Sequence, residues 1–236
     1  MNPGTLYLIP TPLGEGGLNW ILPQQVQEVA ARLGHFIVEH PKTARAFLKR
    51  VGTTVPLSTL HLTILDEHTP PDRLPHLLAP LRTGHDVGLM SEAGCPAVAD
   101  PGAALVRLAH QEGIPVVPLV GPSALMLALM ASGLEGQRFT FHGYLPVAGS
   151  ARKKALRELE VTSRRQRATQ LFIETPYRNT ALLQAVLEAC HDDTLLCVAM
   201  ALTTPQQRIV TRSIAAWKAS APLLEKLPAV FCLQAG

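Results

Sequence analysis

The stretch from Val87 to Gly133 constrains the fold most, because short apolar runs alternate in it with helix-forming runs. The runs "DVGLMSE" and "IPVVPLV" predict strands, and "GAALVRLAHQEG" between them, with glycine at both ends, predicts a helix. Strands that alternate with helices are typical of a parallel sheet whose two faces are covered. This stretch therefore predicts an α/β fold.

The same alternation extends over the first half of the chain. The run "RLPHLLAPLRTG" predicts a helix that Pro75 and Pro80 interrupt. We expect an N-terminal α/β domain over residues 1–119, with a mostly parallel sheet. Its other predicted strands are "TLYLIP", "HFIVE" and "LHLTIL", and its other predicted helices are residues 22–33 and "PKTARAFLKRVG".

The character of the sequence changes after Gly121. "PSALMLALMASG" predicts a helix with Ser123 at its N-cap or within one residue of it. The segments that follow include hairpin-like neighbours, which predict a C-terminal domain with a mixed sheet over residues 120–236. The predicted strands are "RFTFHGYL", "TQLFIE", "TLLCVAM", "QRIVTRS" and "AVFCLQ", and the predicted helices are "RNTALLQAVLEAC" and "IAAWKASAPLLEK".

The composition narrows the class of protein. Of the 236 residues 47% are hydrophobic, which is enough for a sizeable core, and the net charge of +3 is compatible with a nucleic-acid partner. The four cysteines form no CxxC pair and the nine histidines are scattered, so we expect reduced thiols and no metal. Residues 1–20 lack a signal-peptide pattern and no apolar stretch could span a bilayer, which predicts a cytoplasmic protein without a membrane partner.

Three turns rich in glycine and proline follow predicted strands: "PTPLGEGG", "SEAGCPAVADPG" and "LVGPSA". Ligands of open parallel sheets bind beyond the carboxyl ends of the strands, where glycine lets the backbone approach them closely. Each turn alone is typical of an ordinary strand-to-helix connection, and the three together favour a binding site as strongly as that alternative. Neither GxxxxGK[ST] nor a strand followed by GxGxxG is present, so a P-loop site is not expected.

Three stretches together resemble the class III, tetrapyrrole-methylase-like S-adenosylmethionine-dependent methyltransferases. They are "LYLIPTPLG", "GLMSEAGCPAVADPGAALVRLAHQEGIPVVPLVGPSALMLALMASGL" and "LFIETPYRN". Within this family the chain is most similar to the branch that methylates cytidine 2′-oxygens in RNA of the small ribosomal subunit. The resemblance implies two α/β domains, a homodimer, and the methyl donor S-adenosylmethionine in a cleft between the domains.

The resemblance also implies which residues contact the methyl donor. One group lies in the first turn, a second group in the turn that contains "SEAG", a third at the predicted domain boundary, and the last in the second domain. They are Pro10, Pro12, Leu13 and Gly14; Ser91, Glu92, Ala93 and Gly94; Ser123 and Ala124; and Phe172 and Glu174.

The chain departs from the family pattern in the stretches that imply acceptor contacts. It has "EHPK" where the family has E-D-T-R, and "AMALTTP" where the family has A-R-E-L-T-K. A ribose hydroxyl needs a nearby base or a charge that stabilises the developing alkoxide, which makes Glu39, Lys42 and Arg178 candidate catalytic residues, with Arg45 as a further candidate. Two alternatives stay open: Glu39 caps the following helix, or Arg178 pairs with Glu174 on the surface.

A basic segment, "ARKKALRELEVTSRRQR", has two interpretations. It forms a solvated helix face followed by a charged turn, or it contacts RNA phosphates in a salt-sensitive manner. In the second case, charge reversal at Arg164 and Arg165 weakens RNA binding and flattens its salt dependence. The basic side chains are Arg152, Lys153, Lys154, Arg157, Arg164, Arg165 and Arg167.

Taken together, these features predict an S-adenosylmethionine-dependent methyltransferase that acts on ribosomal RNA at a ribose 2′-oxygen, with RNA or the small ribosomal subunit as partner. Two alternatives use the same fold. One is a small-molecule methylase of the tetrapyrrole type. The other is a catalytically silent RNA-binding protein, which the altered "EHPK" and "AMALTTP" stretches keep open.

Overall fold

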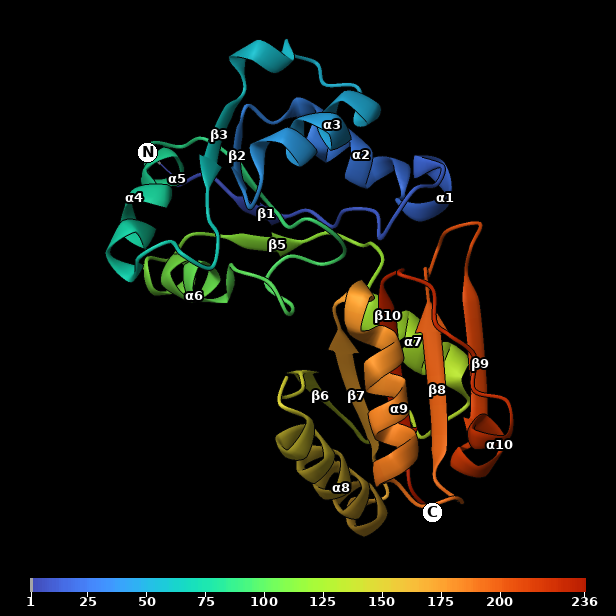
Figure 1. Cartoon of the computed structure of the whole chain (residues 1–236). Helices are drawn as coiled ribbons and strands as arrows, with labels where there is room; N and C mark the ends of the chain where they lie inside the picture. The colour runs from blue at the N-terminus through green and yellow to red at the C-terminus, as the bar shows by residue number, and fades with distance from the viewer. Residues whose placement is uncertain (1) are drawn as a thin grey trace. The chain divides into compact units, whose positions relative to one another are not determined.

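The computed structural model describes residues 2–236 and divides into two compact units, the first ending at Ser123 and the second running from Ala124 to Gly236 (Figure 1). The loop that precedes this division belongs to the first unit. Leu119 N donates to Leu8 O at 3.0 Å, and the backbone of Gly121 packs against Pro10. The predicted boundary between residues 119 and 120 lies inside this loop.

The first unit contains a five-stranded sheet in which every neighbouring pair is parallel, in the order β3-β2-β4-β1-β5. The strands are β1 (Leu6–Leu8), β2 (His35–Val38), β3 (His61–Ile64), β4 (Val87–Met90) and β5 (Val116–Pro118). The helices are α1 (Leu18–Ile21), α2 (Gln24–Arg32), α3 (Pro41–Val51), α4 (Leu74–Leu77), α5 (Ala79–Arg82) and α6 (Ala103–Gln111), with short 3-10 turns at Leu57–Thr59 and Pro71–Arg73.

Helices cover both faces of this sheet, as the sequence predicts. Alternate residues of β2 point to opposite faces: Phe36 and Val38 pack with α2 and α3, and Ile37 packs with the cluster that includes Leu81 and Leu105 of α5 and α6. Burying each such side chain contributes roughly 1.5–3 kcal/mol, so two separate apolar layers hold β4 and β1 at the centre of the sheet.

The predicted interruption near Pro75 and Pro80 is confirmed. Pro75 lies in the first turn of α4 and Pro80 in the first turn of α5, where the missing amide donor costs little. The four-residue helix α1 was not predicted, because its sequence "LNWI" is too short to show a helical period.

The second unit contains a mixed sheet in the order β6-β7-β10-β8-β9, in which only the β6–β7 pair is parallel among the described residues. The mixed sheet of the second domain is therefore also confirmed. The strands are β6 (Phe139–Tyr144), β7 (Thr169–Glu174), β8 (Leu195–Met200), β9 (Arg208–Ser213) and β10 (Ala229–Gln234). The helices are α7 (Ala124–Ser132), α8 (Gly149–Gln166), α9 (Asn179–Ala189) and α10 (Ile214–Ala219), with a 3-10 turn at Pro176–Arg178.

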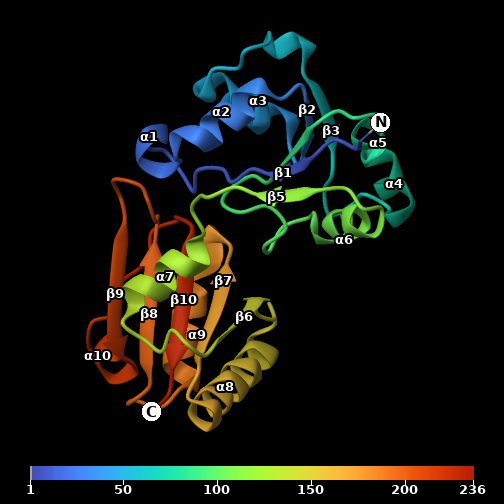
Figure 2. The same ribbon diagram turned by 180° about the vertical axis from the view of Figure 1, so that it is seen from behind.

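The mixed sheet is covered on both faces. Leu156 of α8, Leu182 of α9 and Trp217 of α10 pack in one cluster with Phe172 and Phe231 of the sheet. Helix α7 packs across β8, β9 and β10, on the side turned to the viewer in Figure 2.

The helix predicted over "IAAWKASAPLLEK" is wrong in its second half. α10 ends at Ala219, because Pro222 disfavours helical backbone in the residue before it and cannot continue the ladder itself.

Candidate functional site

The three predicted turns gather at one edge of the parallel sheet of the first unit, as expected. They follow β1, β4 and β5, which are neighbours or near neighbours in the sheet. Thr11 and Gly94 form a backbone bridge, with N–O distances of 2.9 and 3.0 Å, and Thr11 Oγ1 donates to Ser91 O at 3.2 Å. Cys95 Sγ donates to Pro122 O at 3.4 Å. The first turn is thus tied to the second, and the second to the third.

Two glycines make this close approach of loops possible. Gly94 has a φ of +83°, and a Cβ there would lie 3.2 Å from Leu13 Cδ2. A Cβ at Gly121 would lie 2.2 Å from Pro10 Cγ, well inside the contact distance. Backbone therefore forms much of this edge. Pro10 and Leu13, both predicted donor contacts, serve here as packing partners of the glycines.

A hollow of about 180 Å³ opens at this edge, within the first unit. Its wall combines the first turn, the second turn and one side of α3 from Thr43 to Arg50. Four predicted donor contacts line it, and so do Thr43 and Phe47, which the sequence prediction missed. Their only signal was the i, i+4 spacing that places them on one face of a predicted helix. The four predicted residues are Pro12, Gly14, Ser91 and Glu92.

Two polar atoms at this edge are buried without a hydrogen-bond partner among the described residues. They are Ser91 Oγ and Glu39 Oε2. A buried polar group that is left unpaired costs about 1–3 kcal/mol, so such groups are rare where a protein has only stability to maintain. The Glu92 carboxylate, in contrast, accepts from Thr43 Oγ1 at 2.5 Å.

Glu39 is the first residue after β2, beside Ser91 at the end of β4, because Val38 pairs with Met90. Burial raises its pKa, and the Asp100 and Glu92 carboxylates add to that increase. Burial also raises the pKa of Asp100, and Glu92 raises it further. The Ser91 hydroxyl lies close enough to the Asp100 carboxylate to lower that pKa, but it does not reach hydrogen-bond geometry. Three carboxyl groups thus share one site at the carboxyl edge of the sheet.

The alternative that Glu39 caps helix α3 is not what the structure shows. His40 occupies the N-cap position of α3, and in the described chain no side chain forms a cap hydrogen bond there. The Glu39 carboxylate instead lies close enough to the Asp100 and Glu92 carboxylates for their charges to raise its pKa. Lys42 and Arg45 lie on the exposed side of α3, and Ala93 is exposed beside Glu92.

Ser123 and Ala124 stand on either side of the division between the two units. Ser123 directly precedes α7, as the predicted helix start requires, and both residues are half-buried. Their predicted contact with the donor stays a prediction.

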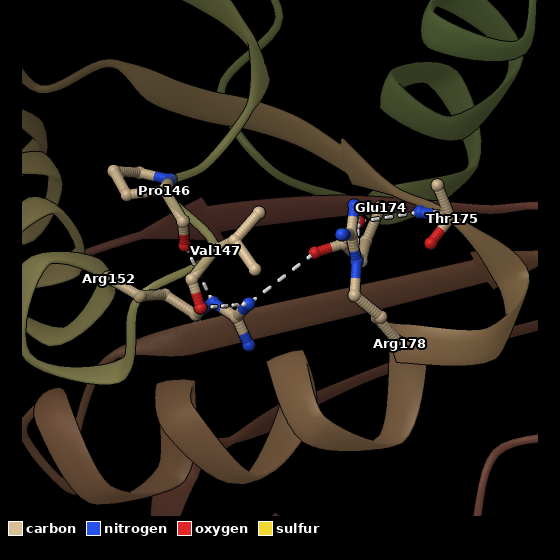
Figure 3. A network of polar contacts seen from close by, with 6 residues as sticks. All are labelled: Pro146, Val147, Arg152, Glu174, Thr175 and Arg178. Carbon is tan, nitrogen blue, oxygen red and sulfur yellow. Dashed lines mark hydrogen bonds and ion pairs between the residues drawn. The ribbon is translucent and has the colours of Figure 1, made fainter.

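In the second unit, Glu174 lies at the carboxyl end of β7 with its side chain only 1% exposed (Figure 3). Its Oε1 accepts from Arg178 Nε at 2.9 Å, from Arg178 Nη2 at 2.7 Å and from Thr175 N at 2.7 Å. Arg152 Nη2 lies 3.8 Å from the other oxygen. The alternative that Arg178 pairs with Glu174 is therefore confirmed, but the carboxylate is buried and the pair is not confined to the surface.

Arg152 does not belong to a solvated basic face. Its side chain is 7% exposed and donates to the carbonyl oxygens of Pro146 and Val147, both at 2.9 Å. The expectation that it contacts RNA phosphates is wrong, because α8 turns this arginine inward toward Glu174 (Figure 3).

Phe172, a predicted donor contact, is fully buried and its ring stacks on Phe231 at a centroid distance of 5.6 Å. The ring is thus part of the core of the second unit. The stretch "AMALTTP" ends β8 and starts the next loop. Ala229 pairs with both Met200 and Glu174, so this stretch and Glu174 lie at the same edge of the mixed sheet.

Comparison with known proteins identifies the family. A sequence profile described as tetrapyrrole (corrin/porphyrin) methylases matches residues 27–217. The chain belongs to this family. It is a methyltransferase, and its α/β fold is the fold of the family.

The chain is also similar to several curated proteins named ribosomal RNA small subunit methyltransferase I. It is 32% identical to the one from Escherichia coli O157:H7 over 87% of this chain and 68% of that protein. It is 34% identical to the Vibrio cholerae protein, over 84% of this chain and 65% of the relative. It is 35% identical to the Micromonospora olivasterospora protein, over 88% of this chain and 62% of that protein. The chain therefore spans roughly two thirds of the length of these relatives.

Two solved structures share the fold. The crystal structure of the methyltransferase CobJ has a TM-score of 0.64 and 22% sequence identity, over 99% of this chain and 95% of that one. The crystal structure of uroporphyrin-III-C-methyltransferase from Thermus thermophilus has a TM-score of 0.56 and 18% sequence identity, over 98% of this chain and 92% of that one.

Within residues 2–236, no helix is long and apolar enough to cross a membrane. The same residues contain no group of His, Cys, Asp or Glu side chains arranged to hold a metal ion. All four cysteines are free thiols, and Cys190, Cys197 and Cys232 are buried.

Proposed function

We propose that this protein transfers a methyl group from S-adenosylmethionine to a ribose 2′-oxygen in RNA of the small ribosomal subunit. Identities of 32–35% to proteins with that RNA in their names support the acceptor. The main evidence for a donor site is the edge where the three turns meet. There, Ser91 Oγ and Glu39 Oε2 are buried without hydrogen-bond partners among the described residues.

The residues at this edge fit such a donor. Pro12, Gly14, Ser91 and Glu92 line the hollow, and its volume of about 180 Å³ is smaller than the roughly 300–1,000 Å³ of complete ligand sites, so it would take only a part of the donor. The Ser91 hydroxyl would donate to a polar atom of that part. S-adenosylmethionine, when bound, supplies an electrophilic methyl group on a positively charged sulfur.

The carboxyl groups of the first unit would serve two purposes. Negative charge on Glu92 and Asp100 would stabilise a nearby cation by Coulomb attraction, more strongly at the half-buried Asp100 than at the exposed Glu92. Glu39 would act as the base, because a carboxylate with a raised pKa is a better proton acceptor than an ordinary one. Glu39 would take the proton of the 2′-hydroxyl while that oxygen receives the methyl group from the bound donor, whose sulfur would leave as a neutral thioether.

The remaining predicted catalytic residues would contact the RNA without taking up the proton. Glu174 holds the Arg178 guanidinium by two hydrogen bonds, so Arg178 would present a fixed positive charge to a phosphate or an alkoxide. Lys42, exposed on the first turn of α3, would contact the RNA backbone. We further propose that the protein acts in the cytoplasm as a homodimer.

Methyl transfer to isolated small ribosomal subunits tests this function. The full chain is incubated with subunits and donor labelled in the methyl group, and the RNA is then digested with alkali. A 2′-O-methyl group blocks alkaline cleavage at its own phosphodiester, so the label is expected in a dinucleotide. Label in mononucleotides would contradict the ribose acceptor. In a parallel reaction with a tetrapyrrole in place of the subunits, a labelled tetrapyrrole together with unlabelled RNA would favour the small-molecule alternative.

A further inference from the structure

An open hollow of about 650 Å³ lies at the amino ends of β6 and β7, within the second unit. Two short segments line it, residues 137–140 before and in β6 and residues 165–168 between α8 and β7. Because Thr169 pairs with Phe139, these segments run side by side at the edge of the mixed sheet. This is the opposite end of β7 from Glu174.

Three arginines line this hollow: Arg138, Arg165 and Arg167. Within residues 2–236, none of the three forms an ion pair with a carboxylate. Glu135, the acid next to them in the chain, uses its carboxylate to accept from Gln137 N at 2.6 Å. The positive charge of the hollow is therefore available to an anion.

Most of the other basic residues of α8 are already paired. Lys153 lies 2.6 Å from Glu188, and Arg164 donates to Gly236 O at 2.7 Å and lies 3.7 Å from Asp193. Arg152 is buried. Of the two residues chosen from the sequence for charge reversal, Arg164 is thus engaged with the protein and Arg165 is not.

The backbone conformation of Arg167 also indicates a functional role for this arginine. Arg167 ends α8 with a φ of +50°, a conformation in which glycine is the favoured residue and other residues cost about 1–2 kcal/mol. An arginine in this position gives up that stability, which is typical of residues kept for function.

An aromatic ring completes the hollow. Phe139 lines it and is 41% exposed. Exposed aromatic rings beside arginines are the usual platform for single-stranded nucleic acid, in which bases stack on the ring and phosphates contact the cations.

We propose that this hollow binds single-stranded RNA, with Arg165 and Arg167 on successive phosphates and the Phe139 ring under a base. The inference rests on the proposed function, since it takes the acceptor to be RNA. It adds a second contact with the acceptor, on the second unit and at the amino ends of its strands.

Binding of a fluorescently labelled single-stranded RNA oligonucleotide, measured by anisotropy between about 50 and 200 mM salt, tests the proposal. The variant Arg165→Gln with Arg167→Gln is expected to bind about tenfold more weakly. The loss of two phosphate contacts should make the negative slope of log affinity against log salt less steep by about 1.4. Phe139→Ala is expected to weaken binding about tenfold without changing the slope, because stacking involves no counterion release.

The matched control is Lys154→Gln with Arg157→Gln, which removes two exposed charges from the same helix outside the hollow. It should leave affinity within about twofold of the unchanged protein. Equal losses in both double variants would overturn the proposal in favour of unspecific attraction. Thermal unfolding of each variant checks that the second unit is intact.

The outcomes also separate this inference from the proposed function. If the unchanged protein binds RNA and methylates it, but the hollow variants do so equally well, only the hollow is wrong. If the unchanged protein binds S-adenosylmethionine but no RNA, both the RNA acceptor and the hollow are wrong.

Discussion

The carboxyl edge of the first sheet and the carboxyl end of β7 in the second unit both gather charged side chains, but they satisfy them differently. Glu174 accepts three hydrogen bonds on Oε1, and its Oε2, which is buried without a hydrogen-bond partner in the described chain, lies 3.8 Å from the buried Arg152 guanidinium. Glu39 and Ser91 each keep a buried oxygen without a hydrogen-bond partner in the described chain. A buried oxygen that faces a buried cation indicates structure, and a buried oxygen with neither a hydrogen bond nor an ion pair in the described chain indicates a place for a ligand.

The largest effect is expected at Glu174. Glu174→Ala leaves the buried Arg152 without its carboxylate and should lower the free energy of unfolding by about 3 kcal/mol, measured by denaturant titration. Glu188→Ala, which removes an exposed partner of Lys153, is the control and should cost less than about 1 kcal/mol. Equal costs for the two would mean that the Glu174 network is no more structural than a surface pair.

Glu39→Gln tests the role of the unpaired carboxylate at the carboxyl edge of the first sheet. Loss of a base should reduce kcat for methyl transfer about 10²-fold while leaving donor binding nearly intact. The raised pKa means that folded Glu39 holds a proton more tightly than the unfolded chain does, so its contribution to stability is lost as pH rises from the unfolded pKa through the folded one. The variant should therefore be more stable than the unchanged protein at neutral pH and equal to it in acid.

Lys42→Gln is the control for that experiment, because it removes an exposed charge next to the same edge. A large fall in kcat for Lys42→Gln, together with normal turnover by Glu39→Gln, would transfer the catalytic role from the carboxylate to the lysine.

The contact between the first and third turns can be broken at Gly121. A methyl group there would press against Pro10 Cγ, so Gly121→Ala should cost about 2 kcal/mol of stability and weaken donor binding. Gly34→Ala is matched to it, since a Cβ at Gly34 has no atom within 4 Å. Donor binding that survives Gly121→Ala would show that the loops need not approach so closely.

The smallest expected effect on stability is the most informative one. Ser91→Ala removes an unpaired buried hydroxyl and should leave the free energy of unfolding unchanged or raise it by up to about 1 kcal/mol. Ser163→Ala, the control, removes a buried hydroxyl that donates to Ala168 O and accepts from Ala235 N, and should cost about 1–2 kcal/mol. A comparable loss at Ser91 would mean that its hydroxyl is structural.

The sequence predicted the arrangement of strands and turns well because that arrangement follows from local patterns. The turn at Ser91 lies where glycine, proline and an apolar run predict it. The sequence predicted less well which side chains contact each other. The pairing of Arg152 with Glu174 and the stacking of Phe172 on Phe231 join residues that are far apart in the chain, and no local period marks such contacts.

Calorimetric titration of the full chain with S-adenosylmethionine tests the central claim most directly, namely that the edge with the unpaired oxygens binds the methyl donor. We expect measurable binding that weakens about tenfold in Ser91→Ala, a loss of about 1.4 kcal/mol, while the stability of that variant stays at or above that of the unchanged protein. Absence of binding at millimolar donor, or equal binding by both proteins, would contradict it.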